Sequence, residues 1–391
     1  MRAIQSIGDL FDLAKGRKAP ETASAPFPGF ERYIQIDDLR PEPELKYARD
    51  PNGTRVGQAD ICIAWDGANA GTVGYGLEGL IGSTIARLRP RRDAQIFSPF
   101  LGRFLQSKFQ VLNEVTTGAT IPHVSKDRLL GLSLFLPERH EQERIAMLLD
   151  QADAIRRKRR EAIELADEFL RSTFLDIALR VRDNSLTGNV EPLSALLANS
   201  DNSIRTGPFG SDLLHSEFGP TGVPVIGIEN AVTNRFRWTA PRCISTQKYQ
   251  DLRRYRIFPG DVILTIMGTT GRVAIAPDDL PECISTKHLC VMTPDRNKVT
   301  SSYLWASLLF DPVVRRQAAQ AGKGAIMEGW NMTIVKSLEI AVPSPTVLAR
   351  FDSTVNLCEA VRSRYEILQK ESENLFQSLA SRAFSGELAA A

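Results

Sequence analysis

The feature that most constrains this chain of 391 residues is an internal repeat. Leu132–Pro137 is an alternating segment that ends in proline, and it matches Leu338–Pro343. A long pattern of heptad-spaced apolar residues follows each segment, beginning at Ile145 in the first copy and at Phe351 in the second. Both the prolines and the heptad patterns are offset by 206 residues. A strand and a helix that recur without an insertion between them are typical of a duplicated unit.

Each copy also contains the pattern of a small sheet. Residues 59–67 align with residues 260–268, which places Asp60 on Asp261. Both segments are apolar runs that end in a glycine-rich loop, a pattern typical of a buried strand and a turn.

The sustained heptads predict two long helices that pack as a coiled coil, because neither pattern contains glycine or proline. The alternative is a pair of separate amphipathic helices, each lying on its own domain. We favour the paired coil because neither helix has an apolar face wide enough for a globular core. The residues predicted to form the apolar seam are Ile145, Leu148, Ile155 and Phe169 in the first helix and Phe351, Val361, Leu368 and Leu375 in the second.

The predicted order is a globular domain, a long helix, a linker, a second globular domain and a second long helix. We place these segments at residues 1–138, 139–180, 181–189, 190–344 and 345–391. Helical stretches at 98–113 and 301–321 accompany the short strands, so the predicted class is α+β.

The composition excludes several classes of protein. The chain has 48 Lys and Arg and 46 Asp and Glu, so any nucleic-acid surface must come from local clustering. No apolar run is long enough for a membrane helix, and Asp9 and Asp12 interrupt the N-terminal segment, which predicts a cytoplasmic protein without a membrane partner. The five cysteines include no C-x-x-C pair, and we predict no metal site.

The sequence carries no recognisable catalytic signature. It lacks a phosphate-binding P-loop, a nucleophile elbow with a plausible triad, and the Asn/Asp-Pro-Pro-aromatic motif of methyltransferases that act on base amino groups. The glycine-rich residues 66–79 lie among strands and open no helix, which argues against a dinucleotide site. We therefore predict no catalytic residue and no cofactor.

Glycine loops beside polar and basic residues favour binding instead. Glycine allows backbone N–H groups to approach a phosphate, and Arg, Lys and Thr donate to phosphates and base edges. A single such loop is also ordinary in any sheet, but loops at matching places in both copies favour a DNA site. The candidate DNA-binding residues are Asn69, Thr72, Arg87, Arg89, Thr117 and Thr120 in the first copy and Ser211, Thr269, Thr270, Arg272, Lys287, His288 and Lys323 in the second.

The densest charge run is residues 156–160 in the first predicted spacer helix. Because these side chains circle the helix, they cannot form one flat patch. A solvated helix surface, contact with DNA phosphates and contact with an acidic partner all remain open.

The whole chain resembles the specificity (S) subunit of type I restriction–modification systems. The segments that carry the resemblance are residues 207–211, 223–226, 259–264 and 284–286, the strand-proline-helix unit, and residues 383–388; the first copy adds residues 121–124 and 141–145. The first copy departs from this pattern at its opening loop, where residues 16–19 stand in place of 207–210.

The resemblance implies two target recognition domains, each reading one half of a split, asymmetric site in double-stranded DNA. The two helices would be antiparallel spacers that dock two methyltransferase (M) subunits, and restriction (R) subunits could join that complex. The S subunit of this family performs no chemistry and binds no S-adenosylmethionine. Two other classes stay open: a coiled-coil scaffold with protein-binding ends, and a nuclease with an unfamiliar site.

Overall fold

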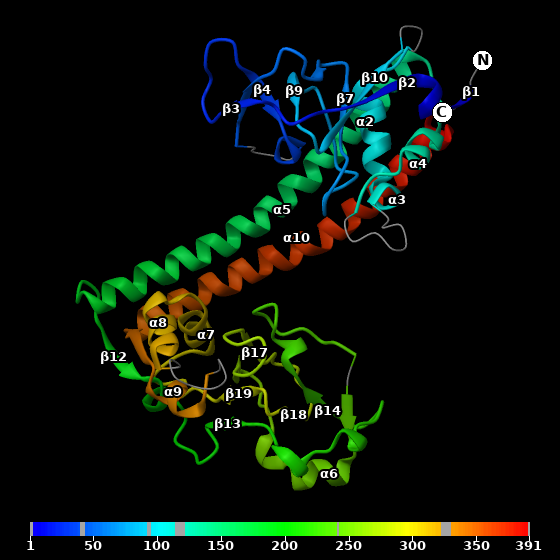
Figure 1. Ribbon diagram of the computed structural model, residues 1–391. Coiled ribbons are helices and arrows are strands. Elements are labelled where there is room, and N and C mark those ends of the chain that lie inside the picture. Colours follow the sequence, from blue (N-terminus) through cyan, green and yellow to red (C-terminus); the bar gives the residue numbers. More distant parts are fainter. Residues whose placement is uncertain are drawn as a thin grey trace. The chain divides into compact units, whose positions relative to one another are not determined.

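The computed structural model describes residues 3–39, 44–91, 95–113, 122–240, 242–321 and 330–389. The chain forms two compact units (Figure 1). The first unit combines residues 1–161 with 366–391, and the second comprises residues 162–365. Each unit therefore contains one globular copy and one end of each long helix, which differs from the five consecutive segments drawn from the sequence.

The first unit contains two sheets and one strand pair. The four-stranded sheet has the order β2-β10-β7-β8, the five-stranded sheet has the order β3-β5-β4-β9-β6, and β1 pairs with β11. The strands are β1 (Ala3–Ser6), β2 (Phe11–Lys15), β3 (Glu21–Ala23), β4 (Glu31–Ile34), β5 (Tyr47–Arg49), β6 (Arg55–Val56), β7 (Ile61–Ala64), β8 (Val73–Tyr75), β9 (Gly79–Ile81), β10 (Ile85–Pro90) and β11 (Ser133–Leu136).

The second unit repeats this plan. Its four-stranded sheet has the order β13-β19-β16-β17, its smaller sheet has the order β15-β14-β18, and β12 pairs with β20. The strands are β12 (Gly188–Pro192), β13 (Ile204–Thr206), β14 (Val223–Ile226), β15 (Arg242–Ile244), β16 (Val262–Thr265), β17 (Val273–Ile275), β18 (Ile284–Ser285), β19 (Leu289–Met292) and β20 (Glu339–Pro343).

Short helices accompany the strands in both units, so the α+β class is confirmed. In the first unit they are α1 (Ile7–Leu10), α2 (Ser98–Ser107), α3 (Phe109–Asn113) and α4 (Lys126–Gly131). In the second they are α6 (Thr246–Asp251), α7 (Ser301–Phe310), α8 (Pro312–Ala321) and α9 (Met332–Ser337). The two long helices are α5 (Arg139–Arg182) and α10 (Pro345–Ser385). Among the described residues, no helix is long and apolar enough to cross a membrane.

The repeat extends to local hydrogen bonds. The Ser125 hydroxyl caps α4, and Asn331, which lies 206 residues further on, caps α9 through its side-chain oxygen. Both side chains accept a bond from a backbone N–H that the first helical turn leaves unpaired. The 206-residue offset therefore also relates the starts of α4 and α9, which did not enter the comparison of the two copies by sequence.

The long helices complete the core of each unit. In the first unit, Phe384 of α10 packs edge-on against Phe100 and Phe104 of α2, with ring centroids 5.5 and 5.2 Å apart. In the second, Phe174 of α5 lies 5.3 Å from the ring of Tyr303 of α7. Each globular copy therefore buries aromatic side chains against a spacer helix, and neither core consists of the globular copy alone.

Within each unit the two long helices run antiparallel, and one contact between them recurs in both units. Arg156 of α5 donates to both carboxylate oxygens of Glu373 of α10 at 3.0 and 2.9 Å. In the second unit Arg362 of α10 donates to Asp167 of α5. Arg362 lies 206 residues after Arg156, and Asp167 lies 206 residues before Glu373. The same ion pair therefore occurs twice with the two helices exchanged.

The observed seam differs from the predicted one. Ile145 and Phe351 are buried, and Leu148, Val361 and Leu368 are half-buried. The remaining three predicted residues are exposed by half or more: Ile155 (50%), Phe169 (57%) and Leu375 (57%).

A row of buried or half-buried residues lies one position beyond the heptad series that contains Leu148 in α5, and likewise one position beyond the series that contains Val361 in α10. Its members are Leu149, Arg156, Ile163 and Leu170 in α5 and Val355, Arg362, Gln369 and Phe376 in α10. Charged side chains occupy part of this seam because they are paired across it, and this arrangement leaves the neighbouring apolar side chains outside.

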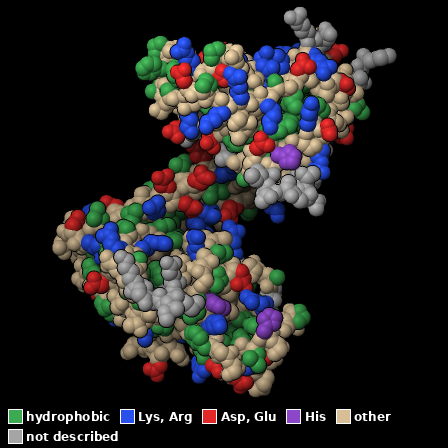
Figure 2. Space-filling view, in the orientation of Figure 1, with side chains coloured by type: hydrophobic (Ala, Val, Ile, Leu, Met, Phe, Trp, Pro, Cys, Tyr) green, Lys and Arg blue, Asp and Glu red, His purple; other side chains and the backbone are tan. Residues whose placement is uncertain are grey.

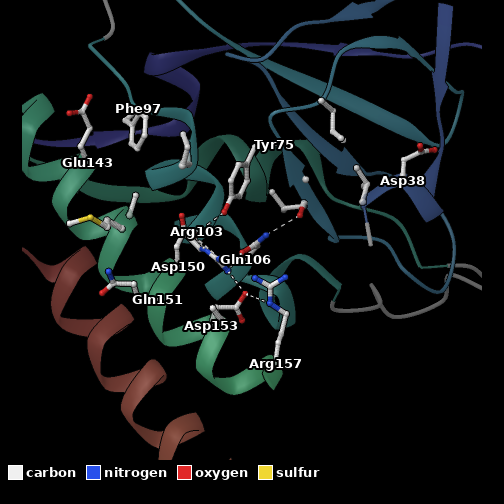
Figure 3. A pocket seen from close by; sticks show the side chains of 18 residues that line it. Asp38, Tyr75, Phe97, Arg103, Gln106, Glu143, Asp150, Gln151, Asp153 and Arg157 are labelled. Carbon is white, nitrogen blue, oxygen red and sulfur yellow. Dashed lines mark hydrogen bonds and ion pairs between the residues drawn. The ribbon is translucent and has the colours of Figure 1, made fainter. Parts of the chain in front are cut away.

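A group of ion pairs holds the globular copy of the first unit to α5 (Figure 3). The Arg103 guanidinium, 9% exposed, pairs with Asp150 at 2.7 Å and with Asp153 at 3.1 Å. Asp153 also pairs with Arg156 and Arg157, and the Tyr75 hydroxyl donates to Asp150 at 3.5 Å. A cavity of about 860 Å³ between α2, β8 and α5 is lined by members of this group: Tyr75, Arg103, Asp150, Asp153 and Arg157. Because its charges are satisfied by one another, this group fixes α2 on α5.

Candidate nucleic-acid interface

The glycine loops of the two copies are equivalent turns. Gly71 N–H donates to Ala64 O at 2.8 Å, and Gly271 N–H donates to Thr265 O at 2.9 Å. The next residue closes each turn, because Thr72 O accepts from Ala64 N–H just as Arg272 O accepts from Thr265 N–H. The sheet registers on both sides agree with this match. Thr72 and Arg272 therefore occupy the same place, and the turn of the first copy is one residue longer.

A buried hydroxyl group organises the turn of the second copy. The Thr265 hydroxyl donates to Thr269 O and accepts from Arg272 N–H at 2.9 Å. Thr269 and Arg272 are exposed, and Thr270 is half-buried. No described residue pairs with the Arg272 guanidinium, so this rigid turn presents an unpaired cation.

The turn of the first copy presents a different surface. The Thr72 hydroxyl donates to Asn69 O at 2.8 Å, and both side chains are half-buried. Thr72 therefore offers a hydroxyl group where Arg272 offers a charge.

The two opening loops make the same close backbone crossing despite their different sequences. A Cβ atom on Gly16 would overlap the carbonyl oxygen of Gly82, and a Cβ atom on Gly207 would overlap that of Ser285. The underlying strands pair alike, since Gly82 N–H donates to Ile34 O as Thr286 N–H donates to Ile226 O. Glycine is therefore required at both positions. The sequence difference after Gly16 changes the loop but not the crossing.

Lys287 and His288 lie beside a cavity of about 340 Å³ in the second unit. The Lys287 side chain is exposed, and no described residue pairs with its ammonium group. Burial lowers the pKa of the half-buried His288 imidazole, and the nearby cations of Lys287 and Arg242 lower it further. His288 is thus neutral at pH 7.5 and can donate or accept one hydrogen bond.

The sequence search missed the residues at the same place in the first copy. His288 O accepts from Ile266 N–H at 2.9 Å, and Thr84 O accepts from Trp65 N–H at 2.7 Å. Ser83 and Thr84 therefore stand where the second copy has Lys287 and His288. The alignment of Asp60 with Asp261, continued along the paired strands, would have revealed them.

Two predicted arginines of the first copy have partners within the protein. Arg89 donates to both oxygens of the buried Asp60 carboxylate at 2.9 and 2.6 Å. Arg87 donates to the backbone oxygen of Arg55 at 2.7 Å. Both guanidinium groups therefore already stabilise the sheet.

The remaining predicted positions lie in a short turn or outside the described residues. Ser211 is exposed in a short turn of 3₁₀ helix, Gly210–Asp212. Three candidate residues lie outside the described residues: Thr117, Thr120 and Lys323.

The described residues offer little to covalent or metal chemistry. They contain no group of three or more His, Cys, Asp or Glu side chains placed to hold a metal ion. All five cysteines are buried, and burial raises the pKa of the Cys62, Cys283 and Cys290 thiols to about 12. Such thiols are protonated near neutral pH and are poor nucleophiles.

Charge on the visible face is mixed. Figure 2 shows Lys and Arg side chains with Asp and Glu among them over both units. A surface of this kind carries no bulk attraction for a polyanion, so recognition depends on the particular loops.

The fold and these loops define a class: a duplicated binding protein in which two α+β units each pack on paired long helices. Residues 3–165 match the family model described as the type I restriction modification DNA specificity domain. The type I restriction enzyme MjaVIII specificity subunit from Methanocaldococcus jannaschii is 22% identical over 395 aligned positions, covering 96% of this chain and 91% of that protein. The EcoBI specificity subunit from Escherichia coli is 22% identical, covering 87% and 76% respectively.

A solved structure agrees with the fold. The S subunit of the type I restriction–modification system from M. genitalium matches with a TM-score of 0.61 and 14% identity, covering 98% of this chain and 96% of that one. These findings confirm the resemblance seen in the sequence: the chain is similar over most of its length to specificity subunits of type I restriction–modification systems, and residues 3–165 match the DNA specificity domain of that family. Its role is DNA sequence specificity.

Proposed function

We propose that each unit reads one half of a bipartite site in double-stranded DNA, and that the chain does so as the non-catalytic S subunit of a type I complex. The observation that carries this proposal is the exchange-symmetric ion pair, Arg156–Glu373 in one unit and Arg362–Asp167 in the other. Duplicated units related in this way are suited to paired half-sites.

The two half-sites should differ in sequence, because the reading loops differ in chemistry. Thr72 stands in the place of Arg272, and Ser83 stands in the place of Lys287. A hydroxyl group can donate or accept a hydrogen bond, whereas an arginine or lysine only donates and carries charge. The recognised site is therefore asymmetric.

The spacer helices dock two M subunits, one on the helices of each unit. Phe169 and Leu375 are each 57% exposed and are 206 residues apart, so they are equivalent apolar sites. Large apolar side chains exposed on a helix are typical of a protein interface. R subunits could join the same complex, and we propose no cofactor for this chain. We place the complex in the cytoplasm, where it meets cellular DNA.

The proposal is tested by exchanging residues 1–138 for the equivalent segment of another family member. The variant is expressed with its M subunit, and the methylated motif is determined by methylome sequencing. We expect only one half of the motif to change. The reciprocal exchange of residues 190–344 serves as the matched control and should change only the other half. A change in both halves from either single exchange would contradict separate reading.

A further inference from the structure

A carboxylate and a cation of the second unit line the same cavity, and the first unit has no cation at the place of the second. Glu229 and Lys287 line the cavity of about 340 Å³, together with Phe218 and Ile228 as apolar wall. The Glu229 side chain is 40% exposed, and Lys287 is exposed as well. Both side chains can therefore contact a molecule that covers the cavity mouth.

The Glu229 carboxylate is held in place from two directions. Arg242 donates to it and also lies over the ring of Phe218, 5.7 Å from the ring centroid. A Cβ atom on Gly227 would overlap the carboxylate oxygens of Glu229, so this carboxylate folds back over the glycine. Any larger residue at position 227 would displace it.

The short turn that carries Glu229 is fixed as well. The buried Asn230 side chain accepts from Gly227 N–H at 3.0 Å and donates to Arg237 O at 2.9 Å. A positioned side chain of this kind loses little conformational entropy on binding, which favours selective recognition.

The first unit has the same turn, but it lacks the glycine and the cation that accompany the carboxylate in the second unit. Asp38 accepts from Gln35 N–H at 2.8 Å, as Asn230 accepts from Gly227 N–H, so Gln35 and Asp37 stand in place of Gly227 and Glu229. Gln35 has a Cβ atom at the place where the Glu229 carboxylate lies in the second unit. Ser83 replaces the cation of Lys287.

We infer that Glu229 and Lys287 together read one C·G base pair of the half-site bound by the second unit. A glutamate accepts a hydrogen bond from cytosine N4, and a lysine donates to guanine O6 and N7 at the major-groove edge. A phosphate presents acceptors alone, whereas a carboxylate beside a cation suits a base pair that presents a donor beside acceptors. This inference rests on the proposed function and names two of its specificity-determining residues.

The test uses the complete complex of this chain with its M subunits. Glu229→Ala and Lys287→Ala are compared with the unaltered complex by methylome sequencing. In parallel, competition binding measures affinity for duplexes in which each base pair of the second half-site is replaced in turn. We expect both variants to relax the motif at the same C·G position, with discrimination reduced about 5- to 150-fold there and unchanged elsewhere.

Two further variants separate recognition from a general surface effect. Gly227→Ala should displace the carboxylate and relax the same position as Glu229→Ala. Glu282→Ala breaks another half-exposed ion pair of the second unit, with Arg256, and should leave the motif unchanged.

Several outcomes would overturn the inference: a second half-site without a C·G pair, an unchanged motif in Glu229→Ala, or an equal loss of affinity for every duplex. Each of these leaves the reading of the first half-site intact, so the proposed function stands. If the unaltered complex reads no bipartite site, the proposed function itself fails.

Discussion

Asp153 and Glu359 occupy equivalent positions of the two long helices, 206 residues apart, yet they should contribute very differently to stability. The Asp153 side chain is 12% exposed and pairs with three guanidinium groups, those of Arg103, Arg156 and Arg157. The Glu359 side chain is 39% exposed and pairs with Arg235. We therefore compare Asp153→Ala with Glu359→Ala.

The expected magnitudes follow from burial. Removing one member of a buried ion pair typically costs 3–5 kcal/mol, because it leaves a charge without its partner. Arg103 keeps Asp150 at 2.7 Å in the variant, so we expect about 3 kcal/mol, the lower end of that range. The pair made by Glu359 is more exposed to water and ions, and its loss should cost about 1 kcal/mol or less.

Hydrogen exchange measured by mass spectrometry resolves the two units in one experiment. Asp153→Ala should lower the opening free energy of α2 and the first half of α5, while peptides of α7 keep theirs. Glu359→Ala should have only a small effect on α7. Equal losses in the two units, or a loss below about 1 kcal/mol in α2, would refute the argument that burial makes Asp153 structural.

Three other outcomes can be measured. Arg272→Ala should reduce the slope of log affinity against log salt by about one, whereas His288→Ala should leave the slope unchanged at pH 7.5, because its lowered pKa keeps it neutral; equal slopes for both variants and the unaltered protein would remove Arg272 from the DNA contact. Gly207→Ala should destabilise the second unit by about 1–3 kcal/mol in hydrogen exchange and impair the reading of its half-site alone, because the new methyl group overlaps a backbone carbonyl. A variant with unchanged hydrogen exchange and an unchanged motif would contradict the close backbone crossing at Gly207. Phe169→Ser should remove one M subunit and the double variant with Leu375→Ser both, as judged by native mass of the complex; full assembly of the double variant would exclude these residues as docking sites.

The sequence was sufficient for the repeat and the long helices, because the 206-residue offset needs only residue types at fixed spacing. The remaining positions of the seam could be identified only from the three-dimensional structure. Ile155 and Phe169 are apolar at heptad spacing, yet they are exposed, and Arg156 takes the seam position because Glu373 lies opposite. A charge in a helix seam is indistinguishable from a solvated charge until its partner on the other helix is known.

The sequence alone did not show which candidate site residues have partners within the protein, for a related reason. Arg89 is a reasonable DNA contact by composition, but its partner, Asp60, directly precedes the neighbouring strand β7 and lies far from it in sequence. Gly227 and Glu229 carried no signal at all, since only the built geometry shows that the carboxylate occupies the space of the missing Cβ atom.

The buried carboxylates that directly precede β7 and β16, those of Asp60 and Asp261, show how one framework can present two different reading surfaces. Asp60 and Asp261 each accept from the backbone N–H three residues earlier, so the framework is the same. The charge partner differs, because Asp60 pairs with Arg89 of β10, whereas Asp261 pairs with Arg205 of β13.

Thr293 occupies the place of Arg89 in the second unit and donates to Asp261 at 2.7 Å. Because an arginine on either neighbouring strand can neutralise the carboxylate, the strand that does not supply it is free to carry another side chain. Each copy can therefore change residues along its sheet and loops without losing the core, and this freedom permits two copies of one fold to recognise different DNA sequences.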